Sequence, residues 1–160
     1  MKKVIMVIGI IVLIPTAWYG IHFAVRMYRS FFNPYLDREI SGPVTLTPEW
    51  LDISPKPPLT AERQIQQVIL TFAIPMQPEY RTWGVVLSDG TIAVPNAQLI
   101  DEYGNVFDLK CSGLDRGGIG FSSAQDLPKD RTYRSVRIKA NKPIRLSNVH
   151  WKCWNQWDVS

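Results

Sequence analysis

The chain has 160 residues, of which 46% are hydrophobic and 20% are charged, a composition typical of a packed globular protein rather than of a disordered chain. Its net charge of +4 is too small to indicate nucleic-acid binding. Because the sequence contains only two His and two Cys, few metal sites or nucleophilic catalytic sites can be assembled from it.

The N-terminal region contains a long apolar segment. Residues 4–25 include no Asp, Glu, Lys or Arg, and a helix of this length would cover about 33 Å, enough to cross the roughly 30 Å hydrocarbon layer of a bilayer. Lys residues precede the segment and Arg residues follow it. We therefore predict that residues 1–27 form a transmembrane anchor. The positive charges at its two ends are similar in number, but a three-residue N-terminal tail and a long C-terminal domain favour a cytoplasmic amino terminus and a C-terminal domain on the periplasmic or extracellular side.

The alternative interpretation of this segment is a cleaved signal peptide, since basic residues followed by an apolar run also begin such peptides. Cleavage requires small residues at two positions separated by one other residue. Ala17 and Ala24 would be the cleavage sites, but Pro15 and His22 occupy the second position. We therefore favour an anchor that is retained in the mature protein.

Polar and aromatic residues in and after the anchor are candidates for contact with other membrane proteins. His22 lies within the span, where it predicts a polar contact with a partner helix, a ligand for a haem or chlorophyll metal, or a side chain close to the headgroups. Phe31, Phe32 and Tyr35 belong to a predicted stem, residues 28–60, which Pro and Gly interrupt. We expect these three aromatic rings to lie on a membrane or partner surface.

The remaining part of the chain, residues 61–160, has the pattern of a β domain. Alternating apolar residues before a proline predict a strand through Val68, Leu70, Phe72 and Ile74. Further strands are expected at 80–87, 91–94, 97–103, 106–111, 132–140 and 144–154, with turns at 88–90 and 104–105 and a loop over 115–120. Short strands with frequent turns predict an all-β fold, an antiparallel β-sandwich with immunoglobulin-like or jelly-roll-like connections.

The last predicted strand changes phase along its length. Ile144 and Leu146 share one face of a regular strand, whereas Val149 and Trp151 have the opposite parity. One extra residue near Ser147–Asn148 would bring both pairs to the core, so the pattern predicts a β-bulge there.

The two cysteines each stand at the end of a predicted strand. Outside the cytoplasm Cys111 and Cys153 are candidates for a disulfide, and the alternative is two free thiols that pack as small apolar side chains. His150 and Cys153 would lie on opposite faces of a regular strand, so no metal site is expected. The sequence also lacks a nucleophile elbow and a phosphate-binding loop, and we expect neither an enzyme nor a cofactor.

Charge is distributed unevenly along the β domain. Residues 129–152 contain eight basic side chains and one acidic one, whereas residues 40–128 contain five basic and ten acidic side chains. In one interpretation the late basic strands lie beside acidic strands and the charges neutralise one another. In the other, Arg134, Arg137 and Lys139 form a basic patch for an acidic partner or anionic headgroups.

Six Trp residues are many for a chain of this length, and three of them recur at every third position near the C-terminus. Trp151 is expected in the core. Trp154 and Trp157 either cover a sheet edge, anchor a protein interface or stack on sugar rings, and Trp83 is a further candidate for the last role.

These features favour a non-enzymatic function. We predict a single-pass membrane protein that serves as an accessory or scaffolding subunit of a larger membrane complex, such as a respiratory or photosynthetic one. Its partners would be other subunits and the lipid bilayer, and not nucleic acid. The alternative is a surface module that binds glycan or a cell-envelope polymer through exposed Trp side chains.

Overall fold

The computed structural model describes residues 36–61, 65–123, 127–128 and 130–154. Among these residues there is no helix that is both long enough and apolar enough to span a bilayer. The predicted anchor over residues 1–27 lies outside the described residues, as do His22, Phe31, Phe32, Tyr35 and Trp157.

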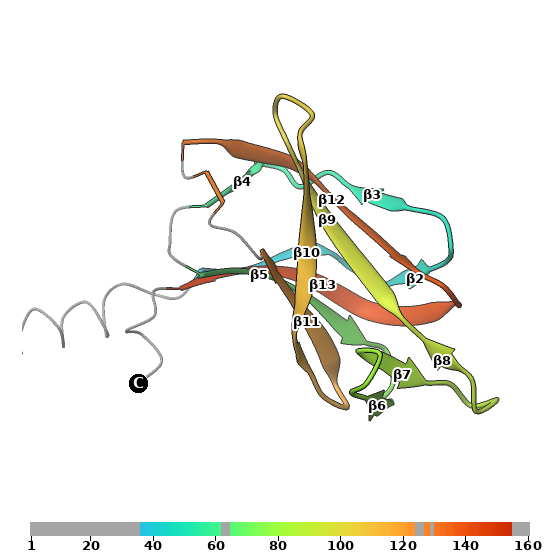
Figure 1. The fold of residues 1–160 in the computed structure, drawn as a ribbon. Coiled ribbons are helices and arrows are strands. Elements are labelled where there is room, and N and C mark those ends of the chain that lie inside the picture. Colours follow the sequence, from blue (N-terminus) through green and yellow to red (C-terminus); the bar gives the residue numbers. More distant parts are fainter. Residues whose placement is uncertain (1–35, 62–64, 124–126, 129, 155–160) are drawn as a thin grey trace, which may run out of the picture. The chain divides into compact units, whose positions relative to one another are not determined.

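The described residues form thirteen strands (Figure 1). In chain order the strands are β1 (Leu36–Ser41), β2 (Val44–Leu46), β3 (Leu51–Ile53), β4 (Leu59–Thr60), β5 (Ile65–Phe72), β6 (Gln77–Glu79), β7 (Gly84–Val86), β8 (Ile92–Ala93), β9 (Pro95–Asp101), β10 (Val106–Leu114), β11 (Gly118–Ser123), β12 (Thr132–Ala140) and β13 (Ile144–Trp154).

Ten strands belong to one antiparallel sheet in the order β1-β13-β5-β11-β10-β9-β12-β3, with β2 also paired to β13 and β4 to β12. The strands β6, β7 and β8 form a separate small sheet. The prediction of an antiparallel all-β domain is therefore confirmed. In place of two separate sheets packed face to face, however, one large sheet curls until it is nearly closed into a barrel, and closure protects strand edges that would otherwise be open.

The segment 44–53 brings the barrel close to closure because it changes partner along its length. Its first part, β2, pairs with the start of β13, and its last part, β3, pairs with β12. Between them Thr47 accepts a backbone hydrogen bond of 2.9 Å from Ala140 of β12. Nearby in the chain, Arg38 of β1 donates a hydrogen bond of 2.7 Å to the carbonyl of Pro57, which links β1 to the loop between β3 and β4.

The residues that were predicted to be a stem therefore contribute strands from Leu36 onward. The strands β1 and β2 pair with β13, and the strands β3 and β4 pair with β12. The β domain begins at about residue 36 in the structure rather than at residue 61.

The central strand β5 shows why alternation identifies the core. Its exposure alternates residue by residue, and Val68, Leu70 and Phe72 are buried in the barrel. The predicted alternation is confirmed as far as Phe72. It is wrong for Ile74, which is 68% exposed because the chain leaves the sheet after Ala73 donates its last backbone bond to Arg145.

The strands β12 and β13 have the predicted bounds, and the hairpin of β9 and β10 is also confirmed. The predicted bulge in β13 is present, since Leu146 pairs with Phe72 whereas Asn148 pairs with the adjacent Thr71. As a result Leu146 and Trp151 both point into the core, at 2% and 1% exposure.

Two other predicted segments differ from the structure. The strand expected over 80–87 is reduced to β7, because the carboxylate of Glu79 accepts backbone bonds from Arg81 and Thr82 and holds a turn there. The loop expected over 115–120 is a tight turn, after which β11 begins at Gly118 and pairs with β5.

Candidate functional site

The barrel has two distinct ends along β13. At one end Leu36 of β1 pairs with Cys153, so residues 1–35 and 155–160 both continue the chain from this end. The opposite end carries Ile144, and the 11 residues of β13 separate the two ends by about 35 Å at the rise of an extended strand. We call the first the terminal end and the second the distal end (Figure 1).

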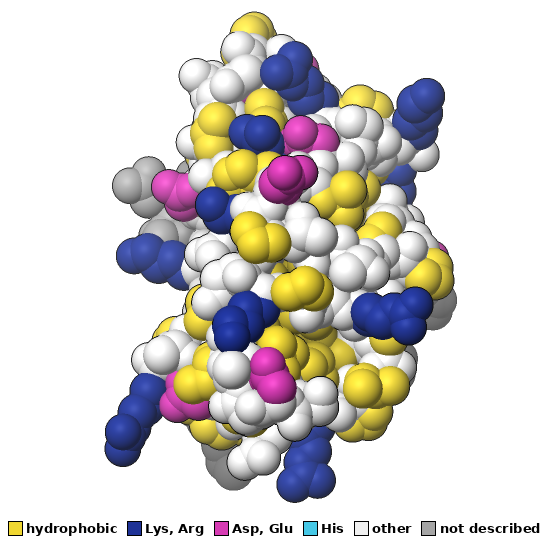
Figure 2. Space-filling view, turned by 90° about the vertical axis from the view of Figure 1, so that its right-hand side faces the viewer, with side chains coloured by type: hydrophobic (Ala, Val, Ile, Leu, Met, Phe, Trp, Pro, Cys, Tyr) yellow, Lys and Arg dark blue, Asp and Glu magenta, His cyan; other side chains and the backbone are white. Residues whose placement is uncertain are grey.

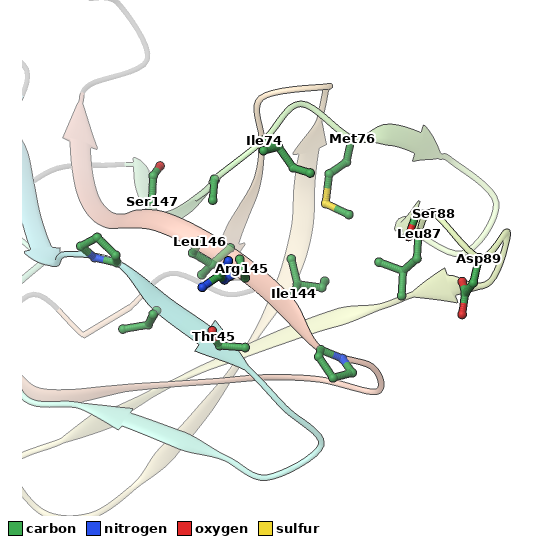
Figure 3. Close-up of a pocket in the computed structure, with 14 residues that line it drawn as sticks. Thr45, Ile74, Met76, Leu87, Ser88, Asp89, Ile144, Arg145, Leu146 and Ser147 are labelled. Atoms are coloured by element: carbon green, nitrogen blue, oxygen red, sulfur yellow. The ribbon is translucent and has the colours of Figure 1, made fainter.

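A groove with a volume of about 870 Å³ lies at the distal end. Its walls come from β2, the start of β13, the linker between β5 and β6, and the turn between β7 and β8 (Figure 3). Much of the lining is apolar, including Val44, Ile74, Met76, Leu87 and Pro143. The exposure of Ile74 shows that the groove is open to solvent rather than enclosed.

Exposed apolar side chains continue from the groove onto the small sheet. Met76 and Leu87 line the groove and directly adjoin this sheet in sequence. On the sheet and its turns, Tyr80, Trp83 and Ile92 are 61%, 45% and 36% exposed. Figure 2 faces the distal end and shows hydrophobic side chains gathered in its lower half, with separate Lys and Arg side chains around them. Contiguous apolar surface of this kind is characteristic of binding sites.

The acidic side chains Glu79, Asp89 and Asp115 of this region accept hydrogen bonds from residues of their own turns. Glu79 accepts bonds from the backbone and hydroxyl of Thr82, and Asp89 accepts bonds of 2.9 and 2.6 Å from the same two groups of Thr91. These hydrogen bonds lower the pKa of both carboxyl groups. Asp115 likewise accepts bonds of 2.6 and 2.8 Å from two backbone amides of its turn.

Three basic side chains of the distal end are Arg116, Lys142 and Arg145. Arg145 is exposed and lines the groove. Lys142 lies close enough to Asp89 to lower the pKa of that carboxyl, and Arg116 is in the turn whose backbone carbonyl accepts a bond from Met76. Within the described part of the chain, none of these three cations forms an ion pair. The groove therefore combines an apolar lining with two charged side chains, Asp89, which accepts hydrogen bonds within its own turn, and Arg145, which has no ion pair among the described residues.

The basic residues that the sequence singled out lie elsewhere, on β12. Arg137 lies 2.9 Å from Asp52, and the ammonium of Lys139 lies 4.3 Å from the ring centroid of Trp50. Arg134 is exposed beside the hairpin of β9 and β10, near Gly104. The interpretation that late basic strands neutralise early acidic ones thus describes Arg137, while these three residues do not form one unpaired patch.

A similar pairing joins the edge strand β1 to β13. The ring of His150 lies 2.6 Å from Asp37, and the ammonium of Lys152 lies 3.0 Å from the same carboxylate. Burial by itself would raise the pKa of Asp37, but the bonds from His150 and Lys152 outweigh burial and lower it. These interactions therefore stabilise the pairing of the edge strand β1 with β13.

The carboxylate of Asp101 organises the hairpin between β9 and β10. Asp101 is fully buried and accepts bonds from the backbones of Tyr103 and Asn105, from the Asn105 amide, and at 2.7 Å from Arg131. Burial would raise the pKa of this carboxyl, but these donors outweigh it and the pKa lies below its ordinary value. Tyr103 and Asn105 belong to the hairpin itself, and Arg131 ties the hairpin to the start of β12. The cluster therefore has a structural role.

Cys111 and Cys153 do not form a disulfide in the structure. Cys153 is buried, whereas Cys111 is half-buried, and burial raises the pKa of the Cys111 thiol. In the sheet order β5 and β11 lie between their strands, β13 and β10. The predicted disulfide is therefore not formed here. No group of three potential metal ligands occurs among the residues that the structure describes.

Of the C-terminal Trp residues, Trp151 is in the core as predicted. The backbone of Trp154 pairs with Ile65 at the end of β13, and its side chain lies outside the description, as does Trp157. Sequence reasoning missed the groove. The available signal was Ile74, an apolar residue just before a proline, which the alternation of β5 assigned to the core.

No protein-family model matches this chain, and a search of curated proteins finds no match.

Proposed function

We propose that this protein is a non-enzymatic, membrane-tethered accessory subunit of a larger membrane complex. In this proposal residues 1–27 anchor the chain in the bilayer, with the amino terminus in the cytoplasm and the β domain in the periplasm or outside the cell. His22, Phe31, Phe32 and Tyr35 contact neighbouring subunits at the membrane, and Trp154 and Trp157 do so at the terminal end.

The observation that carries the proposal is the open apolar groove at the distal end. A side chain such as Ile74, at 68% exposure beside further exposed rings, is unfavourable in water unless another surface covers it. The groove also lies at the distal end, opposite to the end at which β1 begins and β13 ends. This arrangement suits a domain that is held at the membrane and presents a binding surface away from it.

The proposal is tested by extracting membranes in mild detergent and separating the extract on a native gel. We expect the full chain to migrate with a large complex and to remain in the membrane fraction after a carbonate wash. Sequencing of the mature amino terminus should show that residues 4–25 are retained. A free monomer in the extract, or a chain trimmed near residue 17 or 24 and released from the membrane, would contradict the proposal.

A second candidate function is glycan binding through Trp83. This residue has a positive φ of 55° although it is not glycine, and it is 45% exposed. Such a backbone conformation is unfavourable for a side chain of this size, and it is often found where a residue has a binding role. Retention of the full chain on a polysaccharide or peptidoglycan column would support this function, provided that Trp83→Ala abolishes retention and Tyr103→Ala, which alters another exposed ring, does not.

A further inference from the structure

We propose that the groove at the distal end binds an acidic, apolar segment of a partner protein, with Arg145 opposite a carboxylate of that segment. This inference rests on the proposed function as an accessory subunit and specifies the surface that it uses. Three properties of the distal end support it: the charge of the groove, its openness, and the composition and reach of the segments of this chain that could fill it.

The first property is that Arg145 lines the groove without an ion pair, whereas Asp89, the acidic side chain of the lining, already accepts hydrogen bonds from Thr91. Glu79, Asp89 and Asp115 already accept hydrogen bonds from their own turns. Arg145 and Lys142 have no ion pair among the described residues, although elsewhere in the barrel Arg131, Arg137 and Lys152 are paired with Asp residues. A carboxylate that enters the groove would meet the guanidinium of Arg145 beside an apolar lining, and hydrogen bonds between two charged groups are strong.

The second property is the openness of the groove. A site for a small apolar molecule typically buries most of the surface of its ligand. Here Thr45, Ile74, Ser88, Asp89 and Arg145 all line the groove and are all exposed. A groove with exposed walls on several sides is better suited to a chain segment that lies along it than to an enclosed small molecule.

The third property is that the two terminal segments of this chain outside the described residues do not fit as occupants. Residues 1–35 contain no Asp or Glu, so they cannot supply the carboxylate. Residues 155–160 include Asp158, but the four residues from Trp154 to Asp158 extend about 14 Å at most, whereas about 23 Å of strand separate Trp154 from Ser147 at the near edge of the groove. A different protein is therefore the expected partner.

The test uses the full chain in mild detergent and two libraries of immobilised seven-residue peptides. Both libraries carry random apolar residues at six positions, with Glu at the central position in one and Lys in the other. We expect the Glu library to retain at least tenfold more protein than the Lys library. Arg145→Glu should reduce retention by the Glu library at least tenfold, and Ile74→Ser should also reduce it.

Lys110→Glu is the matched control, because Lys110 is an exposed cation on β10 that does not line the groove. This variant should bind both libraries as the unaltered chain does, and unchanged thermal unfolding should show that all variants are folded. Equal retention by the two libraries, or a preference for Glu that survives Arg145→Glu, would overturn the proposal.

Two further measurements identify other occupants. Binding to phosphatidylglycerol vesicles that depends on Arg145, without a preference between the libraries, would assign the groove to lipid and overturn the proposal. Self-association in sedimentation velocity that Arg145→Glu abolishes would assign the groove to a second copy and also overturn the proposal.

The native gel separates this inference from the proposed function: if Arg145→Glu still migrates with the large complex, the groove assignment fails and the function stands. If the unaltered chain forms no complex but the Glu library still depends on Arg145, the function fails and the groove assignment stands.

Discussion

Replacing Trp151 by phenylalanine is expected to change the stability of the β domain by no more than about 1 kcal/mol, although the residue is among the most deeply buried in the barrel. Trp151 is 1% exposed, and among the described residues its indole N–H has no hydrogen-bond partner. A buried donor without a partner costs about 1–3 kcal/mol, because it has given up its bond to water. Phenylalanine removes this donor and keeps an aromatic ring in the core.

The opposing cost comes from the smaller ring. The exchange leaves a void of about 40 Å³, which at about 24 cal/mol per Å³ destabilises the fold by about 1 kcal/mol, and the lost transfer free energy adds a similar or smaller amount. The two effects therefore nearly cancel for Trp151→Phe. Trp151→Ala removes the whole ring and should lower the free energy of unfolding by about 3–5 kcal/mol.

Urea unfolding of the full chain in mild detergent, followed by circular dichroism, measures both variants. Leu70→Ala is the control, since Leu70 is fully buried in β5 and its truncation should cost about 2–5 kcal/mol. If Trp151→Phe loses 3 kcal/mol or more, approaching the alanine variant, the indole N–H must contribute to stability and the reasoning is refuted.

Three further predictions concern Asp101, Ser147 and the pair of Trp residues at 154 and 157. Asp101→Asn should lower the melting temperature at neutral pH. Because the pKa of Asp101 is depressed in the folded state, the stabilisation that its carboxylate provides should be complete above about pH 4 and be lost as the pH falls through that depressed pKa. The melting temperatures of the two proteins should therefore converge in acid, and a constant difference across the pH range would contradict this role. Deletion of Ser147 should prevent folding because it removes the bulge and turns Val149 outward, whereas Ser147→Ala should fold normally, as judged by circular dichroism. Replacing Trp154 and Trp157 together by Ala should weaken assembly on a native gel and leave thermal stability nearly unchanged, and a large loss of stability would instead place them in the core.

The sequence predicted the long strands well, because each of them buries one complete face. The alternation through Val68 and Phe72 and the change of phase around Ser147 both follow from a two-residue period set against a single core. The hairpin turn at Gly104 was also predictable, since its φ of 89° suits glycine.

The candidate site was much harder to predict from the sequence. The groove joins residues from β2, the 73–76 linker, the 87–89 turn and the start of β13, which are far apart in the chain. Arg145 resembles any outward residue of a strand, and only the structure reveals that Asp89 is occupied by its own turn rather than by this cation.

By itself, then, the sequence determined the chemistry of each strand face, the position of the bulge and the uncharged character of residues 4–25, because these depend on neighbours only a few residues away. The tertiary structure decided that the sheet curls toward a barrel, that the predicted stem contributes four strands, and that an apolar groove remains open at the distal end. Strands as short as β2 and β3 have too few residues to show a period, so their pairing depends on the surfaces that distant strands offer them.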